Sequence, residues 1–233
     1  MQYERIRNSP LFHSTMRLVN RVASRFNWKA SAEMLYWRVK KMEEGELHGQ
    51  HFEFFFTTHF GLSQGDFTGK RMLDLGCGPR GSLEWATQAK ERVGLDPLAK
   101  RYLKLGADQH QMSYVEGVAE AIPFPDQHFE VVSSLNSLDH VDGLEQAIGE
   151  IKRVLKPGGV FLLIADIHQV PTLTEPSAFG WDILARFQPE FQVIRESHYE
   201  GHQLYKSIRK GIPFDHQNPK QRYGIITALL QKR

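Results

Sequence analysis

The chain has 233 residues, 41% of them hydrophobic, with one cysteine and a net charge of +2. This size suits one α/β domain with an appendage. The lone cysteine excludes a disulfide framework, and no apolar run approaches the ~20 residues of a membrane span. With no secretory signal pattern either, the composition predicts a cytoplasmic protein.

The first 65 residues differ in character from the rest. Apolar side chains recur at helical spacing from Phe12 to Phe26, with arginines on the opposite side, which predicts an amphipathic helix. Its apolar face is modest, so we expect it to pack on the main domain and not on a membrane. Ser31 is a candidate N-cap for a second helix that ends near Met42.

The segment 52–60 contains five phenylalanines, and Gly61 follows it. So many aromatic rings predict a covered, helical segment. We therefore expect residues 1–65 to form a helical N-terminal extension that covers an active site, and residues 66–233 to form the main domain.

From Lys70 onward, patterns typical of strands and helices alternate, which predicts βαβ units and a parallel sheet. Strands are expected at 71–75, 91–95, 112–115, 129–134 and 159–164, and helices at 81–89, 97–105, 143–155 and 177–187. Two further strands are expected at 190–196 and 223–230, with a polar insertion at 197–222 between them.

A glycine-rich turn follows the first of these strands. Residues 72–81 read Met-Leu-Asp-Leu-Gly-Cys-Gly-Pro-Arg-Gly, and Asp96 ends the next strand 20 residues after Gly76. Such a turn lets a ligand lie against bare backbone N–H groups, and the N-terminus of a following helix favours negative charge there. A carboxylate at the next strand end suits a ribose diol. Together these features predict an adenosine-containing cofactor.

The glycine spacing alone also fits a dinucleotide, so other features must choose the cofactor. Asp74 stands two residues before Gly76, where a dinucleotide site normally has an apolar residue, and an acid there suits a cationic amino group. Residues 116–132 and the Pro157-Gly158-Gly159 turn, which leads into an apolar strand, add two more motifs in order.

With these motifs, residues 68–166 resemble the class I S-adenosylmethionine-dependent methyltransferases, most closely the ubiquinone- and menaquinone-biosynthesis group of small-molecule enzymes. The resemblance implies a Rossmann-like α/β fold: a seven-stranded, mostly parallel sheet with helices on both faces. The last strand would be inserted antiparallel beside its neighbour. It also implies S-adenosyl-L-methionine as cofactor and S-adenosyl-L-homocysteine as product.

The same resemblance assigns roles to cofactor-binding residues. It places Asp74, Gly76, Cys77 and Gly78 around the methionine end, Asp96 at the ribose, Pro97 and Leu98 beside the adenine, Ala119 and Glu120 at the adenine edge, and Asn136 beneath the methionine carboxylate. Glu120 is equally a candidate helix cap, and Cys77 is expected to be a small buried residue, not a nucleophile. Arg80 is bulkier than the small residue common in this turn, and it is a second candidate for the carboxylate.

His140 is the first candidate for a catalytic base, with Asp139 to orient it, and His168 is the second. A structural or solvated His140 is the alternative. Asp139 and Asp166 alone do not predict a metal site, so none is expected.

The acceptor is expected to be a small molecule with an oxygen, nitrogen or carbon nucleophile. Residues 134–137 lack the Asp/Asn-Pro-Pro-aromatic motif of amino-directed nucleic-acid methyltransferases, and the only cysteine is Cys77. The alternatives are an RNA-modifying enzyme that uses the basic ends 1–30 and 195–233, or a non-catalytic S-adenosylmethionine-binding protein. The sequence does not predict an oligomeric state.

Overall fold

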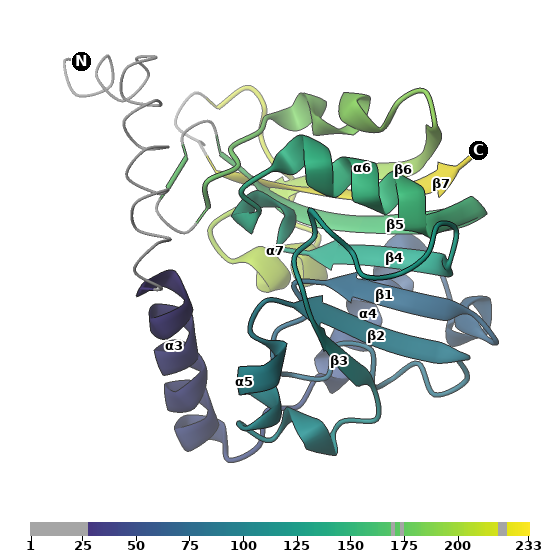
Figure 1. The fold of residues 1–233 in the computed structure, drawn as a ribbon. Coiled ribbons are helices and arrows are strands. Elements are labelled where there is room, and N and C mark those ends of the chain that lie inside the picture. The colour runs from purple at the N-terminus through teal and green to yellow at the C-terminus, as the bar shows by residue number, and fades with distance from the viewer. Residues whose placement is uncertain (1–27, 169–170, 173–174, 219–222) are drawn as a thin grey trace.

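A computed structural model describes residues 28–168, 171–172, 175–218 and 223–233. Its centre is a seven-stranded sheet of order β3-β2-β1-β4-β5-β7-β6 (Figure 1). The strands are β1 Arg71–Leu75, β2 Glu91–Asp96, β3 Ser113–Glu116, β4 Phe129–Leu135, β5 Leu155–Ile167, β6 Phe191–Glu200 and β7 Gly224–Lys232. The first five are parallel, and β7 is antiparallel to both neighbours. All seven expected strands are therefore confirmed, and so is the inserted antiparallel strand.

In the described part of the chain most helices are short. The α-helices are α3 Trp28–Glu44, α4 Glu53–Phe56, α5 Ala99–Leu103, α6 Leu144–Val154 and α7 Leu204–Lys210. Short 3-10 helices are η1 Gln50–Phe52, η2 Thr58–Phe60, η3 Gln64–Phe67, η4 Ala107–Gln109, η5 Leu138–His140 and η6 Trp181–Phe187. No helix in the described part of the chain is long and apolar enough to span a membrane.

Alternating side chains of the central strands form two apolar layers, as the period of two requires. On one face, Leu73 of β1 packs with residues of α6 and η6. On the other face, Met72 packs with the phenylalanines of 52–67. Phe55, Phe56 and Phe60 are buried, which confirms that this segment is covered.

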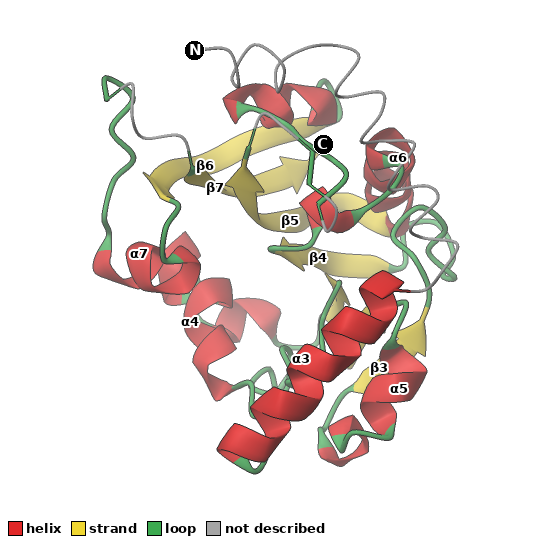
Figure 2. Cartoon of the chain, turned by 90° about the vertical axis from the view of Figure 1, so that its left-hand side faces the viewer, coloured by secondary structure: helices red, strands yellow, loops and turns green. Residues whose placement is uncertain are grey.

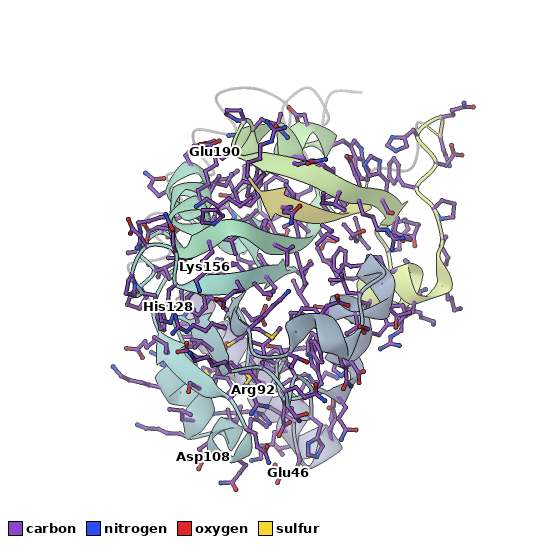
Figure 3. The ribbon with its side chains drawn as sticks, turned by 90° about the vertical axis from the view of Figure 1, so that its right-hand side faces the viewer. Glu46, Arg92, Asp108, His128, Lys156 and Glu190 are labelled. Carbon is purple, nitrogen blue, oxygen red and sulfur yellow. The ribbon has the colours of Figure 1, made fainter. Side chains whose placement is uncertain are left out.

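Helix α3 lies across the edge of the sheet where the parallel strands end (Figures 1 and 2). Its Met34 packs against Leu98 and Tyr102, which begin and continue the helical segment after β2. At the opposite edge, charged side chains such as Arg92, His128 and Lys156 gather near the strand starts (Figure 3). The carboxyl edge under α3 is therefore the place to look for a site.

Two expected helices need correction. Residues 81–89 form turns, since the hydrogen bonds there span three residues, as in Glu84 N–H to Gly81 O at 3.0 Å. The segment is short, and both Leu83 and Trp85 are buried against the phenylalanine layer. In a regular helix these two side chains would point in different directions, and only one of them could reach this layer. In 177–187 only Trp181–Phe187 is helical, and it is a 3-10 helix.

The expected cap at Ser31 is wrong, because the chain is already helical from Trp28 and Ser31 lies inside α3. The expected helix between Phe12 and Phe26 lies outside the described residues. β6 extends to Glu200, so the connection to β7 is shorter than the expected insertion at 197–222.

Candidate functional site

Two cavities meet beneath α3 at the carboxyl ends of β1, β2 and β4. The first cavity has a volume of about 610 Å³ and extends along Asp96 and the 116–120 segment. The second cavity, of about 840 Å³, lies between α3, α7 and the glycine turn. Both are lined by Lys29, Glu33, Gly76, Asn136 and His140.

Each residue that the sequence assigned to the cofactor lines one of these cavities. The first contains Asp96, Pro97, Leu98, Ala119 and Glu120, the second contains Asp74, Cys77 and Gly78, and both contain Gly76 and Asn136. Of the two candidate bases, His140 lines both cavities, whereas His168, as far as the structure describes the chain, lines neither.

Asp96 ends β2 and is 5% exposed. Its Oδ1 accepts a 2.8 Å hydrogen bond from the backbone N–H of Leu98, and its Oδ2 accepts one of 3.2 Å from that of Gly78. Burial raises the pKa of Asp96 to about 7. The carboxyl group is thus fixed in place, and near neutral pH both of its protonation states are populated.

Asp74 of β1 is also buried, but its oxygens already have partners. Strand register places it opposite Ser133 of β4, whose hydroxyl donates to Oδ1 at 2.6 Å. Ser82 donates to Oδ2 at 2.5 Å. Burial raises the pKa of Asp74 to about 6, and the two hydroxyl donors oppose this rise.

The glycine turn differs from its sequence-based prediction in two respects. The N–H groups of Gly76, Gly78 and Gly81 donate to Leu95 O, Asp96 and the Tyr114 hydroxyl, so these three are not bare. The following segment is not helical either, so no helix N-terminus faces the turn. What the turn provides is a backbone that neighbouring groups can approach closely.

That close approach explains Gly76. Its φ is +65°, and a Cβ placed there would lie 2.4 Å from the Cβ of Ser137. The next residue, Cys77, is buried, and burial together with the nearby Asp96 and Asp74 raises the pKa of its thiol. A thiol kept protonated agrees with a packing role.

Arg80 extends from the turn to α3, and its guanidinium is already paired there, so it is not available for the methionine carboxylate of the cofactor. Its guanidinium makes two 2.8 Å hydrogen bonds to the Glu44 carboxylate and lies 5.5 Å from the Trp37 ring. The bidentate pair holds the end of α3 against the turn.

Two α3 residues that the sequence did not single out complete the site. Glu33 accepts a 2.6 Å hydrogen bond from the Tyr102 hydroxyl and faces both cavities. Lys29 donates to the backbone carbonyl of His140 at 3.1 Å, and burial lowers its pKa. No spacing in the sequence marks them, because their place depends on a helix that crosses distant strand ends.

Asn136 and Glu120 close the first cavity. Asn136 has a φ of +61°, and its buried Oδ1 lacks a hydrogen-bond partner among the described residues. Glu120 accepts hydrogen bonds of 2.8 and 3.0 Å from the N–H groups of Asp142 and Gly143, which precede α6. Glu120 thus holds the loop that enters α6, and it also lines the cavity.

Beside His140 lies a group of histidine and carboxylate side chains from the ends of β4 and β5. Asp139 is fully buried, with His140 Nε2 at 3.9 Å and His168 Nε2 at 3.8 Å from its two oxygens. Glu175 Oε2 lies 3.8 Å from His168 Nε2. Burial and the nearby Asp139 and Glu175 raise the pKa of Asp166 to about 7.

Part of the chain is similar to known methyltransferases. Residues 73–163 match the family model described as a methyltransferase domain. A probable phthiotriol/phenolphthiotriol dimycocerosates methyltransferase 2 of Mycobacterium ulcerans is 30% identical over half of this chain and 47% of its own length. A fatty-acid O-methyltransferase of Mycolicibacterium smegmatis is 30% identical over 52% of this chain and 44% of its own. The matches thus span about half the length of these relatives.

The fold has solved counterparts. An S-adenosylmethionine-dependent methyltransferase structure from Listeria monocytogenes has a TM-score of 0.57 at 17% identity, covering 78% of this chain and 99% of its own. The MccD protein has a TM-score of 0.56 at 13% identity, with coverages of 81% and 100%. Residues 73–163 thus match a methyltransferase domain, and the chain has the fold of an S-adenosylmethionine-dependent methyltransferase structure, which points to S-adenosylmethionine as its cofactor.

Proposed function

We propose that the protein transfers the methyl group of S-adenosylmethionine to a small, largely apolar acceptor that binds in the second cavity. The observation that carries this proposal is the shared wall of the two cavities at Gly76, Asn136 and His140. A nucleoside in the first cavity would place its methionine end at this wall, next to an acceptor in the second.

The residues of the first cavity fit the nucleoside. Asp96 presents a fixed carboxyl group for the ribose hydroxyls, and Pro97, Leu98 and Ala119 offer the apolar surface for an adenine ring. The unpaired Oδ1 of Asn136 is a buried acceptor that an ammonium or hydroxyl donor of the ligand would satisfy.

Asp74 acts differently in this proposal from its sequence-based role. Because Ser82 and Ser133 occupy both of its oxygens, it would serve the methionine ammonium through its charge and its hold on the turn. Gly76 and Gly78 allow the cofactor to approach the backbone closely, and Cys77 packs beneath them.

The second cavity is suited to an apolar acceptor. Aromatic and aliphatic side chains of α3, η1 and α7 form much of its wall: Tyr36, Trp37, Phe52, Leu204 and Tyr205. The relatives named above are a fatty-acid O-methyltransferase and a phthiotriol/phenolphthiotriol dimycocerosates methyltransferase. In addition, a sterol 24-C-methyltransferase of Aspergillus fumigatus is 36% identical over 40% of this chain and 27% of its own. These names support an acceptor with a substantial apolar portion.

The sulfonium of the bound cofactor supplies an electrophilic methyl group. The protein's task is to align the acceptor with the methyl–sulfur bond and to exclude water, and such alignment contributes roughly 7–11 kcal/mol. For a hydroxyl acceptor, His140 is our candidate base, since it lines both cavities and its side chain is 38% exposed. His168 would act only indirectly, through its contact with Asp139.

We extend the proposal to the domain organisation: residues 1–65 form a lid, and residues 66–233 form the catalytic domain. The support comes from α3, whose residues line both cavities and pack on the segment after β2.

Isothermal titration calorimetry with S-adenosylmethionine and S-adenosylhomocysteine tests the cofactor part. We expect micromolar binding that Asp96→Ala abolishes, while Asp108→Ala on the far surface (Figure 3) leaves it intact. Transfer of radiolabelled methyl to a panel of fatty acids, lipids and phenols tests the acceptor. Absence of heat with both cofactor forms would refute the proposal. Binding without transfer to any acceptor would favour a non-catalytic protein.

A further inference from the structure

A group of potential metal ligands lies next to the shared wall of the cavities, outside the proposed cofactor contacts. Asp139 and His140 belong to η5, directly after β4, and His168 follows β5. Glu175 comes from the connection beyond it. We call Asp139, His140, His168 and Glu175 the His/carboxylate cluster.

Three of the four side chains bring their potential ligand atoms close together. One ligand atom each from Asp139, His140 and Glu175 lies within 4.8 Å of the other two. The contacts of 3.8 and 3.9 Å between the imidazole nitrogens and the carboxylate oxygens exceed a hydrogen bond. Two ligands that each lie ~2.0–2.2 Å from one ion are roughly 3–4 Å apart, so the 3.9 Å between Asp139 and His140 suits a shared cation, and so do the 3.8 Å contacts of His168.

Asp139 provides an independent sign that something is bound there. Its side chain is fully buried, and neither carboxylate oxygen accepts a hydrogen bond from any residue that the structure describes. A buried carboxylate without donors is costly, and native proteins pair such groups with a cation or with several donors. One oxygen faces His140 and the other faces His168, so both are directed into the cluster.

The charge around the cluster points the same way. Asp139, Asp166 and Glu175 gather negative charge here, since the carboxylates of Asp139 and Glu175 lie near enough to raise the pKa of Asp166. Among the described residues, Lys29 of α3 lies near enough for the charges of Asp139 and Glu175 to act on its pKa, but the hydrogen bond of its Nζ goes to the carbonyl oxygen of His140.

From these observations we propose that the His/carboxylate cluster binds one divalent transition-metal ion. Imidazole nitrogen together with carboxylate oxygen suits Zn²⁺, Mn²⁺, Fe²⁺ or Co²⁺, whereas Mg²⁺ and Ca²⁺ prefer oxygen alone. The ion is held by Asp139, His140 and Glu175, with His168 as the fourth neighbour.

The position of this site gives the ion a role in the proposed function, on which this step rests. Because His140 lines both cavities, a metal at its Nε2 lies at the edge of the acceptor space. There it would bind an acceptor oxygen and orient it toward the methyl group. His140 then serves as a ligand, and it is no longer available as a base.

The metal is tested without any activity measurement. Full-length protein is stripped with a chelator, dialysed, and titrated with Zn²⁺ and Co²⁺ by calorimetry and by the visible spectrum of Co²⁺, with the metal content measured by mass spectrometry. We expect one ion per chain. Asp139→Asn and Glu175→Gln should weaken its binding at least tenfold. His198→Gln is the control, since His198 has its own carboxylate neighbour, Glu196, at 2.8 Å outside the cluster.

Folding of the variants is checked by their circular dichroism and by S-adenosylhomocysteine binding, which should stay within about twofold of the wild type. Metal binding that Asp139→Asn and Glu175→Gln leave unchanged, or that His198→Gln removes instead, would overturn the inference. So would a wild type that binds no ion while it still binds S-adenosylhomocysteine, a result that leaves the proposed function intact. Loss of cofactor binding with a retained metal site would contradict only the proposed function.

Discussion

The backbone N–H of Gly78 donates a 3.2 Å hydrogen bond to Oδ2 of Asp96, which joins the turn after β1 to the carboxyl end of β2. The two halves of the proposed cofactor site are therefore one unit. The turn holds the acid in place, and the acid in return fixes the turn. A substitution of either residue should therefore disturb the positions of both.

The first prediction concerns pH. Burial raises the pKa of Asp96 to about 7, so the free protein loses the carboxylate as the pH falls through that value. Ribose hydroxyls donate best to the ionised form, so S-adenosylhomocysteine affinity should reach its maximum well above pH 7. Below the pKa it should fall by up to about tenfold per pH unit. Calorimetry across this range checks the slope.

Asp96→Asn is the matched variant for this measurement, since it cannot ionise. It should bind more weakly at high pH and show little pH dependence. An equally steep slope in wild type and Asp96→Asn would mean that another group titrates with binding.

A second prediction separates backbone strain from steric clash in the glycine turn. Gly69 and Gly76 have nearly the same φ, +70° and +65°, but a Cβ at Gly69 meets nothing within 4 Å, whereas one at Gly76 meets Ser137 at 2.4 Å. Gly69→Ala should lower the free energy of unfolding by about 1–2 kcal/mol, the cost of a left-handed residue. Gly76→Ala should cost clearly more and abolish cofactor binding.

The double variant Gly76→Ala, Ser137→Gly removes the clash and should recover part of the lost stability. Chemical denaturation of the four proteins gives the comparison. Equal losses for Gly69→Ala and Gly76→Ala would show that the turn has room for the extra carbon.

The strands could be predicted because their signal is local. Runs such as Val131–Leu135 and Phe161–Ile164 are apolar enough to mark buried parallel strands, and the glycines mark the turn that follows β1. Strand order then brings Asp74, Asp96 and Asn136 to one edge of the sheet. This much of the candidate site followed from the sequence.

The remainder depends on tertiary contacts that no local pattern records. Ser133 meets Asp74 only through the register of β1 with β4, and Glu33 reaches the site only because α3 crosses the strand ends. The expected helix at 81–89 failed for the same reason. Burial of Leu83 and Trp85 against the phenylalanine layer outweighs helical preference there.

A third prediction concerns the buried acid of β1. Ser133→Ala removes one of the two hydroxyl donors to Asp74 and leaves Oδ1 without it, which should cost about 1–3 kcal/mol of unfolding free energy. Because burial raises the pKa of Asp74 to about 6, the loss should be largest above that pH, where the group is ionised, and smaller below it.

Ser134→Ala is the control at the neighbouring position, since that hydroxyl contacts Ser137 and not the acid. Thermal melts at pH 5 and pH 8 compare the two variants. A Ser133→Ala loss that does not depend on pH would mean that the charge on Asp74 is not what the hydroxyl stabilises.

A fourth prediction addresses acid sensitivity. Burial, with the nearby Arg195, lowers the pKa of His59 to about 4, and its Nε2 has no partner among the described residues. In the unfolded chain His59 therefore binds a proton near pH 6.5, whereas in the folded protein it does so only near pH 4. This contribution to stability is complete above pH 6.5 and is lost as the pH falls toward 4. His59→Phe should flatten the fall of the melting temperature over this interval, and His202→Gln, on an exposed side chain, should not.

The last prediction tests the proposed lid through the contact of Arg80 with Glu44. This bidentate pair holds the end of α3 against the glycine turn, and α3 lines both cavities. Glu44→Ala should therefore speed the dissociation of S-adenosylhomocysteine severalfold in stopped-flow measurements. Arg80→Ala should do the same, and the double variant should add little, since both changes break one contact.

The pair of Lys40 with Glu43 is the matched control, because it lies on the same helix, has the same 2.8 Å separation and joins nothing to the turn. Lys40→Ala should leave the dissociation rate unchanged. If Lys40→Ala and Glu44→Ala accelerate release equally, the effect comes from the charge or stability of α3 as a whole. If neither does, the helix does not control escape of the cofactor, and residues 28–44 are a fixed wall of the site instead of part of a lid.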